Sequence, residues 1–308
     1  MKRKKGLCLV LLLCLLLTGC AAERPVEDVP AQESTPYMLP EGTQVLDPDN
    51  ETLLIAAVGY DPANGKTRIT SAHILVKDFS GATAVLTLPK DTRAWIDHYE
   101  GEQVIYGEYD SLSRVYAAGE SAGKGVQNLQ KAVTNLLGGV TIDKYALMNA
   151  VQLEMLAETT DGVYVTVESP IPDYEINAGY QEITSRLQSY AAYSYLSDVS
   201  GKEYNGTDKD KLTRHQELMQ ATFAAMQKKL KSSDAPEETA QRMVECISTN
   251  LTAQELISWV AGDPATVFTD FSILPGSHFE DDSVSLWLYD NTKLTDWIIS
   301  HFYTQPEE

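Results

Sequence analysis

The sequence predicts an α/β fold, with a central mixed β-sheet flanked by helices and a C-terminal extension of helices and strands. Short apolar runs with β-branched residues recur along the chain, and the clearest of them is Thr83–Leu88. Segments with apolar residues on one helical face lie between these runs, as in 126–137. Because strand-like and helix-like patterns alternate, we expect them to pack as layers of one domain.

The predicted strands come in the order 53–58, 74–76, 83–88, 142–148, 163–167 and 284–289. The first strand is closed by a turn-forming segment, and the second and third form a hairpin. Pro89 cannot donate a hydrogen bond to a neighbouring strand, so the third strand is expected to end at the rim of the sheet. Residues 93–113 are polar and irregular, and we expect a flap over a cleft there.

The predicted helices cover 126–137, 152–158, 178–197, 208–231 and 292–303, with further helix starts near 234 and 252. Thr252 and Glu255 have the spacing of a capping box. In helix 208–231 an inward stripe is expected, formed by Leu212, Gln216, Met219, Phe223, Met226 and Leu230.

The N-terminus reads as a secretory signal peptide, residues 1–19. Four cations precede an apolar run over 7–17 that is too short to span a bilayer. The run ends in Leu17-Thr18-Gly19-Cys20, which resembles a bacterial lipobox and implies lipidation of Cys20. The alternative is an ordinary signal peptide with an incidental cysteine. Lipidation would place the protein on the outer face of the bacterial cytoplasmic membrane, an extracytoplasmic location.

Residues 20–49 are rich in proline and acidic residues, as in a disordered tether that follows a lipidated cysteine. We expect an α/β domain over 50–232 and a C-terminal extension packed on the core over 233–308. The chain has 44 acidic and 24 basic residues, a formal charge of −20. This charge repels nucleic acid, so any polyanionic substrate must meet a local cationic pocket.

Charged residues follow two predicted strands and mark one predicted helix. Lys90 and Asp91 come directly after Pro89, at the edge of an α/β sheet where ligands bind, although a solvated turn would look the same. Asp61 follows the first strand and is either an Asx-turn former or a site carboxylate. Lys211 and Arg214 are three residues apart on a helix, so they point the same way, and the alternative is a solvated helix flank.

Several blocks stand in order along the chain: Gly59-Tyr60-Asp61, Thr87-Leu88-Pro89-Lys90-Asp91-Thr92, Val115-Tyr116-Ala117, Ile142-Asp143-Lys144-Tyr145, Asp161-Gly162-Val163 and Lys211-Leu-Thr-Arg214-His215-Gln216. Their order and spacing over 53–303 resemble the LytR-CpsA-Psr family of bacterial cell-surface proteins. Members of this family transfer a glycopolymer, as a sugar phosphate, from a polyprenyl-pyrophosphate carrier to peptidoglycan. The resemblance therefore implies a phosphotransferase with an apolar slot for the prenyl tail beneath the sheet.

The resemblance also implies roles for particular residues. Arg214, Lys90 and Asp91 are expected in the catalytic site. The pyrophosphate is expected to bind Lys211, Arg214, Gln216 and Arg68, because guanidinium and ammonium groups neutralise its charge. Asp61 and Asp91 are expected to hold Mg²⁺. The implied partners are a polyprenyl-linked glycopolymer, peptidoglycan and, through Cys20, the membrane.

The chain departs from the family pattern at several of these positions. The family's Arg-Ser-Asp-Thr block falls on Ile69-Thr70-Ser71-Ala72, so a metal-binding aspartate is absent and Arg68 is one place out of register. Lys90 and Lys211 stand where the family has arginine, and a lysine lacks the bidentate fork of a guanidinium. A further arginine block falls on 190–196, which contains no arginine.

Three hypotheses follow from these residues. The first is a divergent phosphotransferase that links a glycopolymer to the cell wall, with an eroded active site. The second is a relative without turnover that binds a polyprenyl phosphate lipid or a partner in the cell envelope. The third is a plain lipoprotein scaffold.

Overall fold

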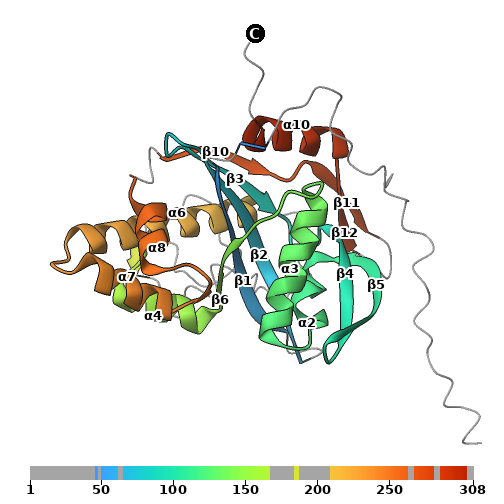
Figure 1. The fold of residues 1–308 in the computed structure, drawn as a ribbon, viewed down its shortest axis with the longest axis horizontal. Helices are drawn as coiled ribbons and strands as arrows, with labels where there is room; N and C mark the ends of the chain where they lie inside the picture. Colours follow the sequence, from blue (N-terminus) through green and yellow to red (C-terminus); the bar gives the residue numbers. More distant parts are fainter. Residues whose placement is uncertain are drawn as a thin grey trace, which may run out of the picture. The chain divides into compact units, whose positions relative to one another are not determined.

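A mixed β-sheet organises the structure, a computed structural model that describes residues 46–47, 50–61, 65–166, 184–186, 209–262, 267–280 and 285–303. Within these ranges six strands form one sheet in the order β10-β3-β2-β1-β6-β9 (Figure 1). Their bounds are β1 Glu51–Asp61, β2 Lys66–Lys77, β3 Thr83–Leu88, β6 Lys144–Met148, β9 Ser248–Thr249 and β10 Phe268–Ile273. The β1–β6 and β10–β3 pairs are parallel, and the β1–β2, β2–β3 and β6–β9 pairs are antiparallel. The predicted α/β fold with a mixed sheet is confirmed.

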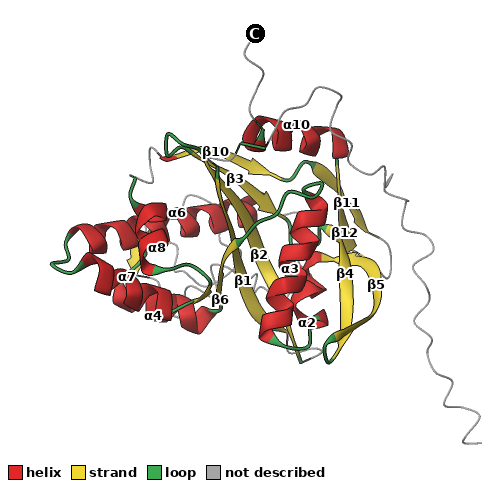
Figure 2. Ribbon diagram, viewed as in Figure 1, coloured by secondary structure: helices red, strands yellow, loops and turns green. Residues whose placement is uncertain are grey.

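Helices cover both faces of this sheet (Figure 2). Against one face pack α2 (Val115–Ala118), α3 (Ala122–Leu136) and α10 (Asn291–Phe302), which share a core with alternate residues of the strands such as Leu54, Ile74 and Leu86. Against the other face pack α6 (Lys209–Lys231), α7 (Pro236–Glu245) and α8 (Ala253–Val260). Leu53 and Leu75 point to that side. Both faces are therefore buried, which explains why the central strands read as continuous apolar runs.

Residues 93–113 differ from the expected irregular flap. They form an antiparallel hairpin, β4 (Arg93–Glu100) and β5 (Gln103–Ser111), followed by a 3-10 turn at Leu112–Arg114. Ala94 and Ile96 enter the core, while Trp95 faces Tyr109 across the two strands. Trp95 and Tyr109 are thus an aromatic cross-strand pair, of the kind that stabilises a sheet.

The structure tests two further predictions, the helix over 178–197 and the capping box at Thr252. The helix expected over 178–197 is wrong at Thr184–Arg186, which forms β8 and pairs with β7 (Tyr164–Thr166); the rest of that helix lies outside the described residues. The capping box at Thr252 and Glu255 is confirmed, with both reciprocal hydrogen bonds present at the start of α8. Helix α4 (Ala150–Thr159) begins with a second capping box, which Asn149 and Gln152 form.

The C-terminal segment contributes to the sheet itself, since β9 and β10 form its two edges. Another hairpin, β11 (Gly276–Glu280) and β12 (Ser285–Tyr289), lies beside β4. Trp287 connects it to the turn after β3, because its backbone N–H donates to the carbonyl oxygen of Asp91 at 2.7 Å. No helix in the described part of the chain is long and apolar enough to cross a bilayer.

Candidate functional site

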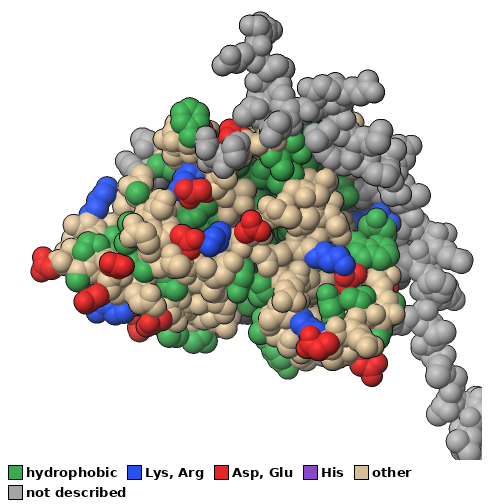
Figure 3. Space-filling model, in the orientation of Figure 1, with side chains coloured by type: hydrophobic (Ala, Val, Ile, Leu, Met, Phe, Trp, Pro, Cys, Tyr) green, Lys and Arg blue, Asp and Glu red, His purple; other side chains and the backbone are tan. Residues whose placement is uncertain are grey.

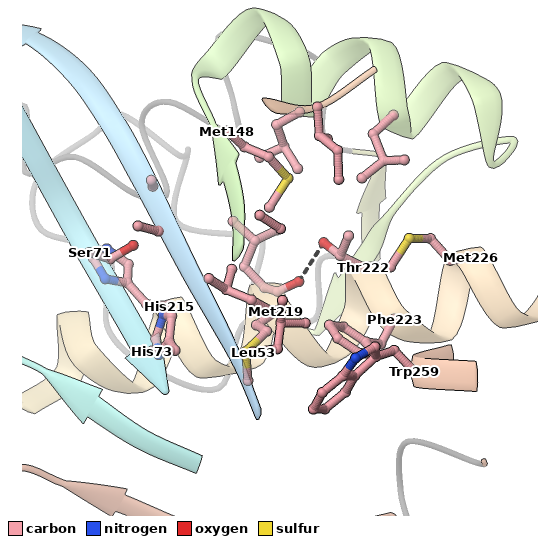
Figure 4. A pocket seen from close by; sticks show the side chains of 18 of the residues that line it. Leu53, Ser71, His73, Met148, His215, Met219, Thr222, Phe223, Met226 and Trp259 are labelled. Atoms are coloured by element: carbon pink, nitrogen blue, oxygen red, sulfur yellow. Dashed lines mark hydrogen bonds between the residues drawn. The ribbon is translucent and has the colours of Figure 1, made fainter. Parts of the chain in front are cut away.

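An apolar slot lies between the sheet and helix α6 (Figure 4). Its walls come from β1, β2, β6, α4, α6 and α8, and its volume is about 70 Å³. The predicted inward stripe of α6 supplies one wall through Met219, Phe223 and Met226. Met148 of β6 adds a third methionine. Because methionine side chains adapt their shape, these walls can yield to a long, flexible apolar ligand.

One end of the slot is polar. Ser71 and His73 of β2 and His215 of α6 gather there, away from Phe223 and Trp259 (Figure 4). The rings of His73 and His215 meet edge to face, with centroids 6.3 Å apart. The slot therefore combines an apolar stretch with one polar end, as expected for an amphiphilic ligand with one polar head group.

A hydrogen-bond chain links this polar end to the end of β3. Gln216 donates through Nε2 to Thr87 Oγ1 at 2.7 Å, and Thr87 Oγ1 lies 3.0 Å from Nδ1 of His73. Since the Thr87 hydroxyl accepts from Gln216, its own proton can go to His73 Nδ1, which leaves the other ring nitrogen protonated. These hydrogen bonds hold α6 against β3 at Thr87, three residues before Lys90.

His73 is 3% exposed, and burial lowers the pKa of its imidazole from 6.5 to about 4. A neutral ring in the folded state cannot take the proton that the unfolded chain takes below about pH 6.5, so stability is lost as the pH falls toward 4. We expect the free energy of unfolding to drop by about 2 to 3 kcal/mol more between about pH 7 and pH 4.5 in the native chain than in a His73→Gln variant. Urea unfolding at both pH values measures this difference; equal losses would contradict it.

The predicted cations occupy different environments. Arg214 is only 1% exposed and directly precedes His215, so the alternative of a solvated helix flank is wrong for this residue. Lys90 is half-buried in the turn after β3. Its carbonyl oxygen accepts from Ser111 Oγ at 3.0 Å and from the backbone N–H of Ser113 at 2.8 Å, which fixes the turn. Lys211 lies in the first turn of α6, and its side chain is outside the described residues.

The next two predicted residues pair with each other. Arg68 Nε lies 2.7 Å from Asp61 Oδ2, where β1 and β2 extend beyond the slot. The carboxylate of Asp61 is therefore already paired with a cation of the chain. Asp91 is buried at the end of β3. Cys20 lies outside the described residues.

Charged side chains elsewhere are dispersed. On the face shown in Figure 3, lysine and arginine side chains stand singly among aspartate and glutamate.

A model of the LytR-CpsA-Psr family matches residues 22–295, most of the chain. The chain belongs to the LytR-CpsA-Psr family. The match extends from the segment before β1 to within α10, and so includes both walls of the slot. The recognition made from the ordered sequence blocks is confirmed.

Solved structures show the same fold at low sequence identity. B. subtilis TagV matches with a TM-score of 0.62 at 16% identity, over 84% of this chain and 100% of the other. Protein gbs0355 from Streptococcus agalactiae matches with a TM-score of 0.61 at 15% identity, over 84% of this chain and 91% of the other. TagT bound to LI-WTA matches with a TM-score of 0.59 at 18% identity, over 86% of this chain and 92% of the other. No curated protein matches the sequence significantly.

The magnesium ion that the LytR-CpsA-Psr family implies has two predicted carboxylate ligands here, Asp61 and Asp91, and a donor set poorer than the family pattern. The described residues contain no group of three or more carboxylate, histidine or cysteine side chains placed to hold a metal. Asp61 is bound by the guanidinium of Arg68, a cation of the chain itself. Ser71, at the place of the family's second aspartate, lines the polar end with a hydroxyl. Mg²⁺ is bound through one or two carboxylates together with phosphates and waters, so the loss of the family's second aspartate weakens the site without removing its remaining carboxylates.

Sequence reasoning missed several residues of the site. Ser71, His73 and Thr87 were not expected there, because a polar residue inside a buried strand has no distinctive spacing. The available signal was the alternation of β2, in which Ser71 and His73 share a face with Leu75. Asn149, in the capping box of α4, also lines the slot.

Proposed function

We propose that this chain binds a polyprenyl-pyrophosphate-linked glycopolymer and transfers the glycopolymer, as a sugar phosphate, to the cell wall. The observation that carries the proposal is the slot: an apolar length that ends at Ser71, His73 and His215. His215 directly follows the buried Arg214 on α6. The prenyl chain would lie among Met219, Phe223 and Met226, and the pyrophosphate would reach the polar end. TagT, which has the same fold, was solved bound to LI-WTA.

The predicted cations Arg214, Lys90 and Lys211 are of the kind that suits a pyrophosphate. In the proposed reaction an acceptor hydroxyl oxygen forms a bond to the phosphorus that carries the sugar, and the bond from that phosphorus to the polyprenyl phosphate breaks. Negative charge gathers on the leaving polyprenyl phosphate, which Arg214, Lys90 and Lys211 would neutralise. Gln216 would hold the polar end in place through Thr87. Asp91 is the carboxylate that would take the proton of the acceptor hydroxyl.

A second function, binding without turnover, is favoured by one observation. Asp61, one of the two predicted metal ligands, is ion-paired with Arg68, and Ser71 stands in place of a further aspartate, so the carboxylate set for a metal is poorer than the family pattern. A chain of this kind would still bind a polyprenyl phosphate lipid in the slot and present it to a cell-envelope partner. For both functions we propose that Cys20 is lipidated and that 20–49 tethers the domain outside the cytoplasmic membrane.

The test is incubation of the protein with a polyprenyl-pyrophosphate-linked oligosaccharide and an oligosaccharide acceptor from peptidoglycan. Release of polyprenyl phosphate with labelling of the acceptor supports transfer, whereas thermal protection by the lipid without release supports binding alone. Because the carboxylate set of the described residues is poorer than the family pattern and contains no group of three metal-binding side chains, we expect the same result with Mg²⁺ and with EDTA. A reaction or a thermal shift that appears only with Mg²⁺ would contradict this expectation, and neither release nor protection would leave the scaffold hypothesis.

A further inference from the structure

We propose that a second hollow, between hairpin β4–β5, helix α3 and strand β12, is a carbohydrate-binding site that takes a neutral sugar unit of a glycan. Its volume is about 380 Å³, within the range of roughly 300–1,000 Å³ of small-molecule sites. Its side chains are Arg93, Trp95, Tyr109, Asn135 and Tyr289 above a floor of Ala94, Ala132 and Leu136.

This hollow is separate from the lipid slot. Its floor belongs to the core that includes α3, whereas the walls of the slot belong largely to the core that includes α6. The two cores pack on opposite faces of the central sheet. A ligand in the hollow would therefore leave the slot open, and the two sites can be tested independently.

Two aromatic rings form a right-angled corner in the hollow. Trp95 and Tyr109 are cross-strand partners whose ring centroids are 5.1 Å apart, with the ring planes at 80°. Tyr109 is 46% exposed even though it packs against Trp95. A pyranose has an apolar C–H face that stacks on an aromatic ring, while its hydroxyls project outward to hydrogen-bonding groups. The exposed part of the Tyr109 ring, next to polar side chains, matches that pattern.

The tryptophan ring is held in place before any ligand arrives. Its Nε1 donates to Asp97 Oδ1 at 2.9 Å, and Asp97 is buried and ion-paired with Lys131 of α3. The ring also lies on the backbone of Gly107, where an added Cβ would come within 2.5 Å of it. A ring fixed on three sides loses little conformational entropy on binding, which favours affinity.

The polar groups around the rings suit hydroxyls better than phosphates. The Arg93 guanidinium lies over the Tyr109 ring, with its central carbon 3.9 Å from the ring centroid, and it offers N–H donors beside that ring. Asn135 is exposed and offers both an amide donor and a carbonyl acceptor. Burial raises the pKa of Tyr289, which therefore keeps its hydroxyl proton at neutral pH.

The charge of the site argues for a neutral ligand. Among the described residues that line the hollow, Arg93 is charged and the remainder are neutral. The whole chain carries a formal charge of −20, which repels polyanions at a distance, and one guanidinium does not offset that repulsion. The side chains thus match the hydroxyl and amide groups of a neutral saccharide.

Isothermal titration calorimetry of the full-length protein in detergent, with neutral oligosaccharides of glucose, galactose and N-acetylglucosamine, tests the proposal. We expect at least one of them to bind. Tyr109→Ala and Asn135→Ala should each weaken that binding by about tenfold or more. Asn135 is exposed on a helix, so this variant remains informative if loss of Tyr109 disturbs the hairpin.

Two control variants separate this site from its surroundings. Tyr106 is exposed on the same hairpin, stacks on His98 and does not line the hollow, so Tyr106→Ala should leave binding unchanged. Ala57 of β1 lines the lipid slot, so Ala57→Trp, which obstructs that slot, should also leave sugar binding unchanged. No heat with any neutral oligosaccharide, equal weakening by Tyr106→Ala, or preference for a polyanionic glycan or a peptide would overturn the proposal.

Discussion

An Ala57→Trp variant is expected to lose the binding of polyprenyl pyrophosphate while the protein stays folded. Ala57 lies on β1, lines the slot beside Ser71 and is half-buried. An indole at this position would fill a space of about 70 Å³ that the prenyl chain needs. Overpacking costs a folded protein typically about 1 to 3 kcal/mol, within what a domain of this size tolerates.

The measurement is the thermal shift caused by polyprenyl pyrophosphate, with far-ultraviolet circular dichroism to confirm folding. We expect the ligand-induced shift of the native protein to vanish in the variant. The matched control is Ala224→Trp, because Ala224 is an exposed residue of α6 outside the slot. An Ala57→Trp protein that is folded and still stabilised by the ligand would show that the prenyl chain binds elsewhere.

Removal of the Arg214 guanidinium is expected to have the largest effect on the lipid head group. Hydrogen bonds to charged groups contribute about 1.5–3 kcal/mol each, and a guanidinium can make two to one phosphate. We therefore expect Arg214→Ala to lower the affinity for polyprenyl pyrophosphate by about 100-fold or more. The affinity for the uncharged polyprenyl alcohol, which has no phosphate, should change little.

The comparison of pyrophosphate with alcohol makes this test specific to charge. Arg214 is buried, so Arg214→Met is a second variant that keeps most of the side-chain volume. Arg214→Lys keeps the charge without the bidentate fork, so its affinity for polyprenyl pyrophosphate should lie between that of the native protein and that of Arg214→Met. Arg114→Ala is the control, since Arg114 is exposed and pairs with Asp110. Equal losses for the pyrophosphate and the alcohol would assign Arg214 a structural role only.

The backbone of the site could be predicted wherever local patterns determine structure. Thr83–Leu88 is the buried strand β3, ended by Pro89 as expected. The stripe of α6 that holds Met219 and Phe223 does line the slot, because helical periodicity fixes which residues share a face. These are properties of one segment, and the sequence of that segment is enough to determine them.

Burial and pairing between segments could not be predicted in the same way. Helical phase placed Arg214 beside Lys211 but could not show that Arg214 is fully buried, because depth depends on what packs against the helix. The ion pair of Arg68 with Asp61 depends on the register of β1 and β2, which shifts at a bulge between Ala57 and Val58. The β4–β5 hairpin was missed because exposed strand faces alternate polar and aromatic residues, as irregular segments also do.

A crystal structure of the protein with a polyprenyl pyrophosphate tests the account most directly. We expect the prenyl chain between the sheet and α6, in contact with Met219 and Phe223. The pyrophosphate should lie at the end formed by Ser71, His73 and His215, within hydrogen-bond distance of Arg214. A lipid found on another surface, or one that enters the slot with its head group at Trp259, would contradict the account.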